Sequence, residues 1–228
     1  MKRSAFFGGL SLVSVILAFA SVSCSLRSDE TTTALSPHRF AALLKEISPE
    51  DWHKLPLKEQ TQDRMDALLC ELDQLNRHFI ESDDIGAFQS IVEIDSHIAA
   101  SIGVFGVMEI ANRNYMIKPS SRHLREQSLS TLAGFTSHSS PHVRTAALYA
   151  LGVMKRHEYR DLVASRLDDT AASNLFFPPF VESNYGMDTS VHTVARQTLN
   201  KMLGEVAAKD YLLSVRRDSK AKKAVRPE

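Results

Sequence analysis

Cysteine, glycine, proline and net charge are all scarce in this chain. Its 228 residues include two cysteines, nine glycines and eight prolines, and 27 basic residues balance 27 acidic ones. Two cysteines form at most one disulfide, which excludes a scaffold held together by several. The balanced charge gives no reason to expect nucleic acid as a partner. Few glycines and prolines, with plentiful Ala, Leu, Ser and Arg, favour a helical protein.

The common short motifs of catalytic and metal sites are also absent. The sequence contains no P-loop, G-x-G-x-x-G, G-x-S-x-G or H-E-x-x-H pattern. His138 and His142 are four residues apart, but the segment 139–141 between them ends in proline and keeps them off a common helical face. Other histidines stand alone in the sequence: His97, His123, His157 and His192. We therefore predict no catalytic residue, no metal site and no cofactor.

The longest apolar run, from Ala5 to Ala20, is too short to cross a membrane. A spanning helix needs about 20 apolar residues. Two basic residues precede the run and small residues follow it, which is typical of an export signal. Residues 1–23 are therefore predicted to be a signal peptide, and the mature chain is expected to work outside the cytoplasm.

The residues at the end of the signal resemble the bacterial lipoprotein box. The match is Ser21-Val22-Ser23-Cys24, although the family usually has Leu or another aliphatic residue in place of Ser21. The resemblance implies a lipid anchor on Cys24 at the membrane. Ala18-Phe19-Ala20 is a competing cleavage site that would release a soluble periplasmic or secreted protein. An uncleaved anchor is a third alternative.

The presence or absence of a lipid on Cys24 decides whether the two cysteines can form a disulfide. A lipid on Cys24 leaves Cys70 as the remaining thiol, predicted to be buried in a helix as a small apolar residue. Without the lipid, a disulfide between Cys24 and Cys70 is the alternative. Residues 24–36 are polar and are predicted to be a tether.

Residues 37–118 form the N-terminal helical region. Ser36-Pro37 predicts one helix start and Ser48-Pro49 predicts another, because serine caps helices and proline suits their first turn. A long helix is predicted from Leu57 to about Ile80. The apolar stripe of this long helix is Met65, Leu68, Leu69, Leu72, Leu75 and Phe79.

Helical spacing resumes from Ile85 to about Ile117, with a break expected near Asp95-Ser96. Residues 98–111 are apolar nearly all round, so this helix is expected to be buried among others. Gly103 and Gly106 are unfavourable inside a helix by about 1 kcal/mol each. A close approach of two helices, or a bend, would explain them.

The second half carries one recognisable pattern. Residues 143–152, VRTAALYALG, resemble the first helix of a bacterial HEAT-like repeat, V-R-x-x-A-x-x-A-L-G. Ser140-Pro141 begins this helix, and the family's second helix would be Tyr159 to Asp169. A weaker copy begins at Val191 with a second helix near 206–215. A fainter echo lies at 124–134.

The resemblance covers roughly residues 119–215 and implies stacked helix pairs, since one pair cannot bury its apolar face alone. Arg144 matches the family's arginine, which often pairs with an acid in the adjoining unit, whereas His192 replaces it in the next copy. The predicted fold is all-α, either a HEAT-like α-solenoid or an irregular bundle of stacked helical hairpins. The residues predicted to share one face are 143, 147, 151 and 154 in the first copy and 191, 195, 199 and 202 in the second.

Residues 170–187 exceed the length of one repeat unit and are predicted to be an insertion. Pro178-Pro179 excludes helix and favours an extended backbone there. Insertions in solenoids often lie on the binding face, so the aromatic residues are candidates for partner binding. The alternative is a loop folded back over the core. The aromatic residues are Phe176, Phe177, Phe180 and Tyr185.

Residues 216–228 form a basic tail, predicted to be disordered, with contact to anionic lipid as the alternative. Taken together, we expect an exported protein of the cell envelope that acts as a helical scaffold or adaptor for another envelope protein. One alternative is an enzyme or enzyme subunit with a site in the solenoid groove. The other is a structural lipoprotein that touches membrane or wall through its tail. Export disfavours a nucleic-acid partner.

Overall fold

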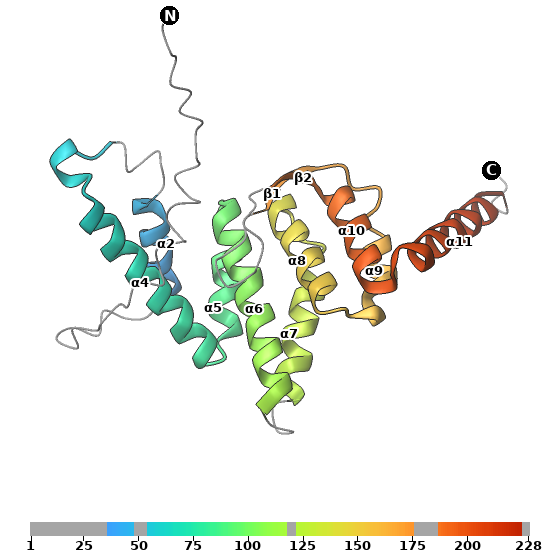
Figure 1. Cartoon of the computed structure of the whole chain (residues 1–228), viewed down its shortest axis with the longest axis horizontal. Helices are drawn as coiled ribbons and strands as arrows, with labels where there is room; N and C mark the ends of the chain where they lie inside the picture. The colour runs from blue at the N-terminus through green and yellow to red at the C-terminus, as the bar shows by residue number, and fades with distance from the viewer. Residues whose placement is uncertain (1–35, 48–53, 118–121, 176–186, 225–228) are drawn as a thin grey trace, which may run out of the picture.

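The computed structural model describes residues 36–47, 54–117, 122–175 and 187–224. Within these ranges it contains nine α-helices, two short 3-10 turns and one two-stranded antiparallel sheet. The predicted all-α class is confirmed. Figure 1 shows the helices arranged in a row from α2 and α4 at one end to α11 at the other. None of the helices in these ranges is long and apolar enough to cross a membrane.

Helices α2 (Pro37–Glu46) and α4 (Gln62–Glu81) form the N-terminal end of the row. The predicted helix start at Ser36-Pro37 is confirmed, because the Ser36 hydroxyl accepts a hydrogen bond from the Arg39 amide. The helix predicted near Ser48-Pro49 lies outside the described residues. All six predicted stripe residues of α4 are buried: Met65, Leu68, Leu69, Leu72, Leu75 and Phe79.

Helix α4 begins later than predicted. The 3-10 turn η1 (Leu57–Glu59) precedes it, and the hydroxyl of Thr61 then accepts a hydrogen bond from the Arg64 amide. A threonine at this position satisfies one of the free N–H groups of the first turn, so the α-helix starts there rather than at Leu57.

The predicted break near Asp95-Ser96 is confirmed, with α5 (Ile85–Val92) before it and α6 (His97–Ile117) after it. Every residue from Ala99 to Ala111 is buried except Glu109, as expected for a helix that is apolar all round. Helix α6 contacts α4, α5, α7 and α8, so it is the central helix of the fold.

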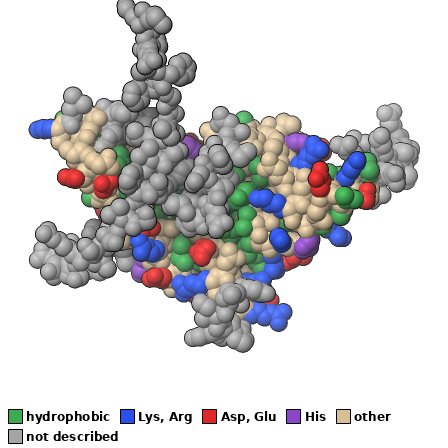
Figure 2. Space-filling model, in the orientation of Figure 1, with side chains coloured by type: hydrophobic (Ala, Val, Ile, Leu, Met, Phe, Trp, Pro, Cys, Tyr) green, Lys and Arg blue, Asp and Glu red, His purple; other side chains and the backbone are tan. Residues whose placement is uncertain are grey.

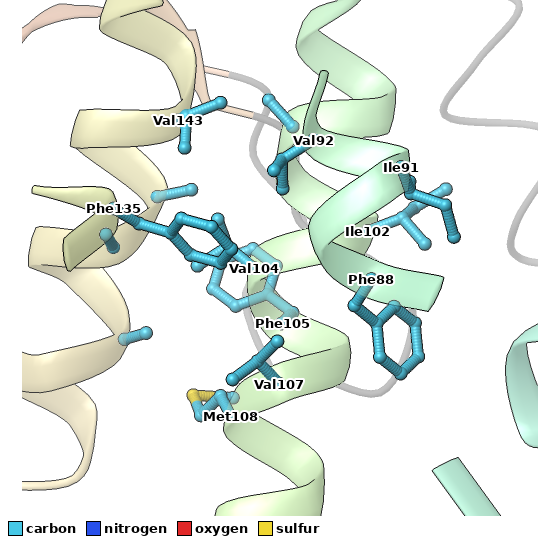
Figure 3. Packing of buried hydrophobic residues seen from close by; sticks show 14 of the residues in the cluster. Phe88, Ile91, Val92, Ile102, Val104, Phe105, Val107, Met108, Phe135 and Val143 are labelled. Atoms are coloured by element: carbon cyan, nitrogen blue, oxygen red, sulfur yellow. The ribbon is translucent and has the colours of Figure 1, made fainter. Parts of the chain in front are cut away.

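A close crossing of α5 over α6 explains both glycines of α6. A Cβ atom on Gly103 would lie 2.5 Å from Val92 Cγ1, and one on Gly106 would lie within 2.5 Å of three ring atoms of Phe88. Figure 3 shows Phe88 and Val92 on α5 beside α6. Close approach, rather than a bend, is therefore the reason for glycine at both positions.

Three parallel helices form the middle and C-terminal part of the row. α6, α8 (Pro141–Val153) and α10 (Val191–Leu203) lie side by side (Figure 1). The chain passes between them through α7 (Arg122–Phe135), then through the turn η3 (His157–Tyr159) and α9 (Arg160–Ala164), and it ends in α11 (Glu205–Ala224). Stacked helices are thus present, while membership of the HEAT-like family stays a prediction.

The predicted inward face of the two repeat helices is buried, except that Met154 is only half-buried. The buried members are Val143, Ala147, Leu151, Val191, Ala195, Leu199 and Met202. Gly152 brings α8 close to α10, since a Cβ there would lie 3.0 Å from the Thr198 side chain. The Thr198 hydroxyl donates to the carbonyl of Leu148 at 3.0 Å across the same contact.

Two helix predictions in the second half need correction. The second helix predicted over 159–169 is only α9, because the amides of Arg166 and Leu167 bond to carbonyls three residues back and the chain then turns. In contrast, α11 runs well past the predicted end at 215. Residues 216–224, expected to be disordered, have a helical backbone, which fits their content of Arg, Lys and Ala.

Candidate partner-binding site at the base of the insertion

The structure describes both ends of the 170–187 insertion but not its centre. The candidate residues Phe176, Phe177, Phe180 and Tyr185 lie outside the described residues. Strands β1 (Ala172–Leu175) and β2 (Met187–Ser190) pair antiparallel, with Ala172 opposite Ser190 and Leu175 opposite Met187. This pairing was not predicted, and it brings the two ends of the insertion together.

The first strand faces the helical stack with alternate residues. Ser173 and Leu175 are buried, whereas Ala172 and Asn174 are exposed. Strand β1 contacts α8 and α6. The base of the insertion is therefore part of the packed fold, at the end of the row where α6, α8 and α10 begin (Figure 1).

An ion pair ties α8 to the residues just before β1. The guanidinium of Arg144 donates to both carboxylate oxygens of Asp169, with Nε–Oδ2 at 2.8 Å and Nη2–Oδ1 at 3.2 Å. Its Nη1 donates to the carbonyls of His138 and Ser139 at 2.8 and 2.7 Å. The resemblance implied an acid in the adjoining unit, but the partner found here lies in the same unit.

Asp169 also links this ion pair to the insertion and to α10. Its carboxylate accepts a hydrogen bond from the Ala171 amide, and its carbonyl accepts one from the His192 amide. Burial by itself would raise the pKa of Asp169, but the hydrogen bonds from Arg144 and Ala171 outweigh it, so this pKa lies below its ordinary value. Asp169 is therefore ionised at neutral pH and connects three segments.

A histidine at the start of α8 holds strand β1. The Nδ1 atom of His142 accepts a hydrogen bond from the Asn174 amide at 3.0 Å and lies 3.3 Å from the Ser173 hydroxyl. Accepting an N–H requires the lone pair of this nitrogen, so the neutral ring carries its proton on Nε2. That arrangement leaves no lone pair for a metal ion on either ring nitrogen.

In the sequence these histidines stand apart from one another. The structure places His97, His142 and His192 at the same end of the helical stack. The rings of His97 and His142 lie 6.0 Å apart between centroids, and His192 Nδ1 contacts the Leu167 carbonyl. Each of the three occupies the first or second position of one parallel helix. The sequence carried a signal for this arrangement, since each histidine stands at the start of a predicted helix. Parallel neighbouring helices bring their first residues to one end.

Acidification is expected to destabilise this end of the stack. Burial, and to a lesser extent the nearby His142, lower the pKa of His97. The unfolded chain then takes up a proton at a higher pH than the folded one, so stability is complete above the unfolded pKa of about 6.5 and is lost as the pH falls through the folded pKa. In thermal melts over this pH range, His97→Gln should flatten the fall in Tm.

The matched control for that prediction is His123→Gln, because His123 is exposed on α7. It should leave the pH dependence of Tm unchanged. Equal slopes for the two variants would contradict the role given to His97.

No group of three His, Cys, Asp or Glu side chains in the described ranges is arranged to hold a metal ion. Cys70 is half-buried on α4 and is disulfide-bonded. The one other cysteine in the sequence, the predicted lipid site Cys24, lies outside the described residues. A lipid thioether and a disulfide exclude each other at one sulfur, so the two uses of Cys24 are strict alternatives.

No family model, curated protein or solved structure matches this chain. Function is therefore argued from its own residues and geometry.

Proposed function

We propose that this protein is an exported adaptor of the cell envelope, and that it binds another envelope protein through the centre of its 170–187 insertion. The observation that carries the proposal is the anchored base of the insertion. Strand pairing, the Arg144–Asp169 ion pair and the His142–Asn174 hydrogen bond all act within a few residues of the segment's two ends. A segment held at both ends loses less conformational entropy on binding than a free loop.

The composition between the anchored ends supports a protein partner. Residues 176–186 contain four aromatic side chains and two prolines. Aromatic residues dominate the energetics of many protein interfaces, and proline limits the number of conformations that binding must restrict. The envelope location rests on the export signal and on the lipoprotein-type residues that end at Cys24.

The test is crosslinking and capture in intact cells with the full-length protein and a Phe176→Ala/Phe177→Ala/Phe180→Ala version of equal Tm. We expect one partner to be captured by the wild type and lost from the triple variant. The matched control is Val153→Ala, which removes an exposed apolar side chain at the opposite end of α8. It should capture the same partner as the wild type.

Two outcomes would overturn the adaptor proposal: capture of the same partner by the triple variant, or no specific partner for any version.

In the same cells, Cys24→Ser should release the protein from the membrane fraction if the lipid anchor is present. Cys70→Ser is the control for that step, because it removes the other cysteine and leaves the lipid site intact.

A further inference from the structure

One face of the terminal helix α11 packs against the rest of the fold. Ala208 is fully buried, and Tyr211, Leu212 and Val215 are half-buried. The hydroxyl of Tyr211 donates to the carboxylate of Asp161 on α9, and α11 also contacts α10. This face docks α11 onto the end of the stack.

The opposite face carries apolar side chains that nothing in the described part of the chain covers. Val206 is 77% exposed and Leu213 is 44% exposed. They are seven residues apart, which places them two turns apart on one side of the helix. The exposed Lys209 and Asp210 lie between them, so the stretch between the two apolar side chains carries one charge of each sign. Figure 2 shows hydrophobic and Lys/Arg side chains beside each other at this end of the molecule.

Beyond Val215 the helix continues away from the body (Figure 1). Residues 216–224 contain five basic residues and one acid, Asp218. Positions 217 and 220 follow Leu213 by four and seven residues and so share its side of the helix. The exposed face of α11 is thus a short apolar stripe that continues into basic positions.

A helix that extends away from the body with many basic residues is unfavourable when only water surrounds it. Residues 216–224 carry five basic residues and one acid, a net charge of +4, so charges of one sign predominate along this stretch. A surface of opposite charge would relieve the repulsion and favour the helical state.

We propose that α11 is an interfacial helix that binds the surface of an anionic phospholipid membrane. Val206 and Leu213 contact the boundary between headgroups and acyl chains, and the basic residues contact the phosphates. Apolar side chains flanked by Lys and Arg are the pattern of helices that lie in the membrane interface, and long basic side chains reach from that depth to the headgroups. The binding surface lies at the opposite end of the chain from the predicted anchor and is separate from the insertion.

The experiment measures binding of the full chain, carrying Cys24→Ser to prevent lipidation, to phosphatidylcholine vesicles with and without phosphatidylglycerol. The N-terminal apolar segment is present in every sample, so differences between variants report α11. We expect preference for anionic vesicles that weakens with added salt. Arg217→Glu/Lys220→Glu should lower binding to them by about 25-fold or more, since each basic residue near such a surface contributes about 1 kcal/mol.

The matched control is Lys45→Glu/Arg196→Glu, which makes the same change in net charge at exposed positions on α2 and α10. It should retain the binding of the wild type. Equal binding to both kinds of vesicle, an equal loss in the two variants, or no loss in Arg217→Glu/Lys220→Glu would overturn the proposal. None of these outcomes bears on capture through the insertion, so the two proposals fail separately.

Discussion

Gly106→Ala is expected to lower the free energy of unfolding by about 2 kcal/mol or more. In an open helix this substitution would stabilise by up to about 1 kcal/mol, because alanine is the better helix former. Here the added methyl would lie within 2.5 Å of three atoms of the Phe88 ring. Phe88 is fully buried and packs edge-on against Phe79, so the ring has no space to move away. Overpacking of this kind costs about 1–3 kcal/mol.

Gly134→Ala on α7 is the matched control, measured by urea unfolding beside Gly106→Ala. Gly134 is exposed, and a Cβ there meets nothing within 4 Å. It should raise the free energy of unfolding by a few tenths to about 1 kcal/mol. The two glycines should therefore differ in sign. Stabilisation by both substitutions would mean that α5 and α6 do not cross as closely as described.

Arg144→Ala is expected to lower the free energy of unfolding by about 2–4 kcal/mol. The side chains of Arg144 and Asp169 are 13% and 20% exposed, so the pair is largely removed from water. Truncating Arg144 leaves the Asp169 carboxylate without its counter-charge and removes the donors to the carbonyls of His138 and Ser139. Loss of one partner from a buried pair costs about 3–5 kcal/mol, and the residual exposure lowers that value here.

Hydrogen exchange gives the local measure of the same change. If Arg144 holds the base of the insertion, the amides of β1 and β2 should exchange faster in Arg144→Ala than in the wild type. The two proteins are compared under conditions in which their global free energies of unfolding are equal. Arg122→Ala is the control, because Arg122 is 85% exposed and its pair with Glu126 lies along one helix. That substitution should change stability by less than about 0.5 kcal/mol. Similar effects at both arginines would remove the special role of Arg144.

Acid provides a second test of the same ion pair. The pKa of Asp169 is lowered in the folded protein, so its contribution is complete above the unfolded pKa of about 3.9 and is lost as the pH falls through the folded pKa. This window lies below the one set by His97. A plot of stability against pH should therefore show two separate losses, and Arg144→Ala should reduce only the more acidic one.

Local sequence patterns predicted most of the helical architecture. The cap at Ser36, the stripe of α4, the break near Asp95-Ser96 and the burial of α6 were all confirmed. Each depends on residues within a few turns of one another, through capping hydrogen bonds and 3.6-residue periodicity. The start of α8 followed from Ser140-Pro141, whereas the start of α10 at Val191 followed from the resemblance to the repeat. The lipid site Cys24 and the four aromatic candidates remain predictions.

The base of the insertion could not be predicted from local patterns. Nothing near Asn174 indicates that its amide meets His142, and nothing near Asp169 indicates that it pairs with Arg144. Strand β1 is four residues long, so its alternating pattern is too short to be recognised in the sequence. Its partner strand also lies beyond the centre of the insertion. The turn that follows α9 places Asp169 beside Arg144, and the local pattern over 159–169 does not indicate it.

By itself, then, the sequence determined which segments are helices, which face of each is apolar, and the predicted export of the chain. These properties follow from neighbours along the chain, and from a leader recognised by its composition. Only the tertiary structure decided that Gly106 faces Phe88, that the rings of His97 and His142 lie beside each other, and that the insertion is anchored at both ends. Those contacts join residues far apart in sequence, and they exist only once the parallel helices have packed.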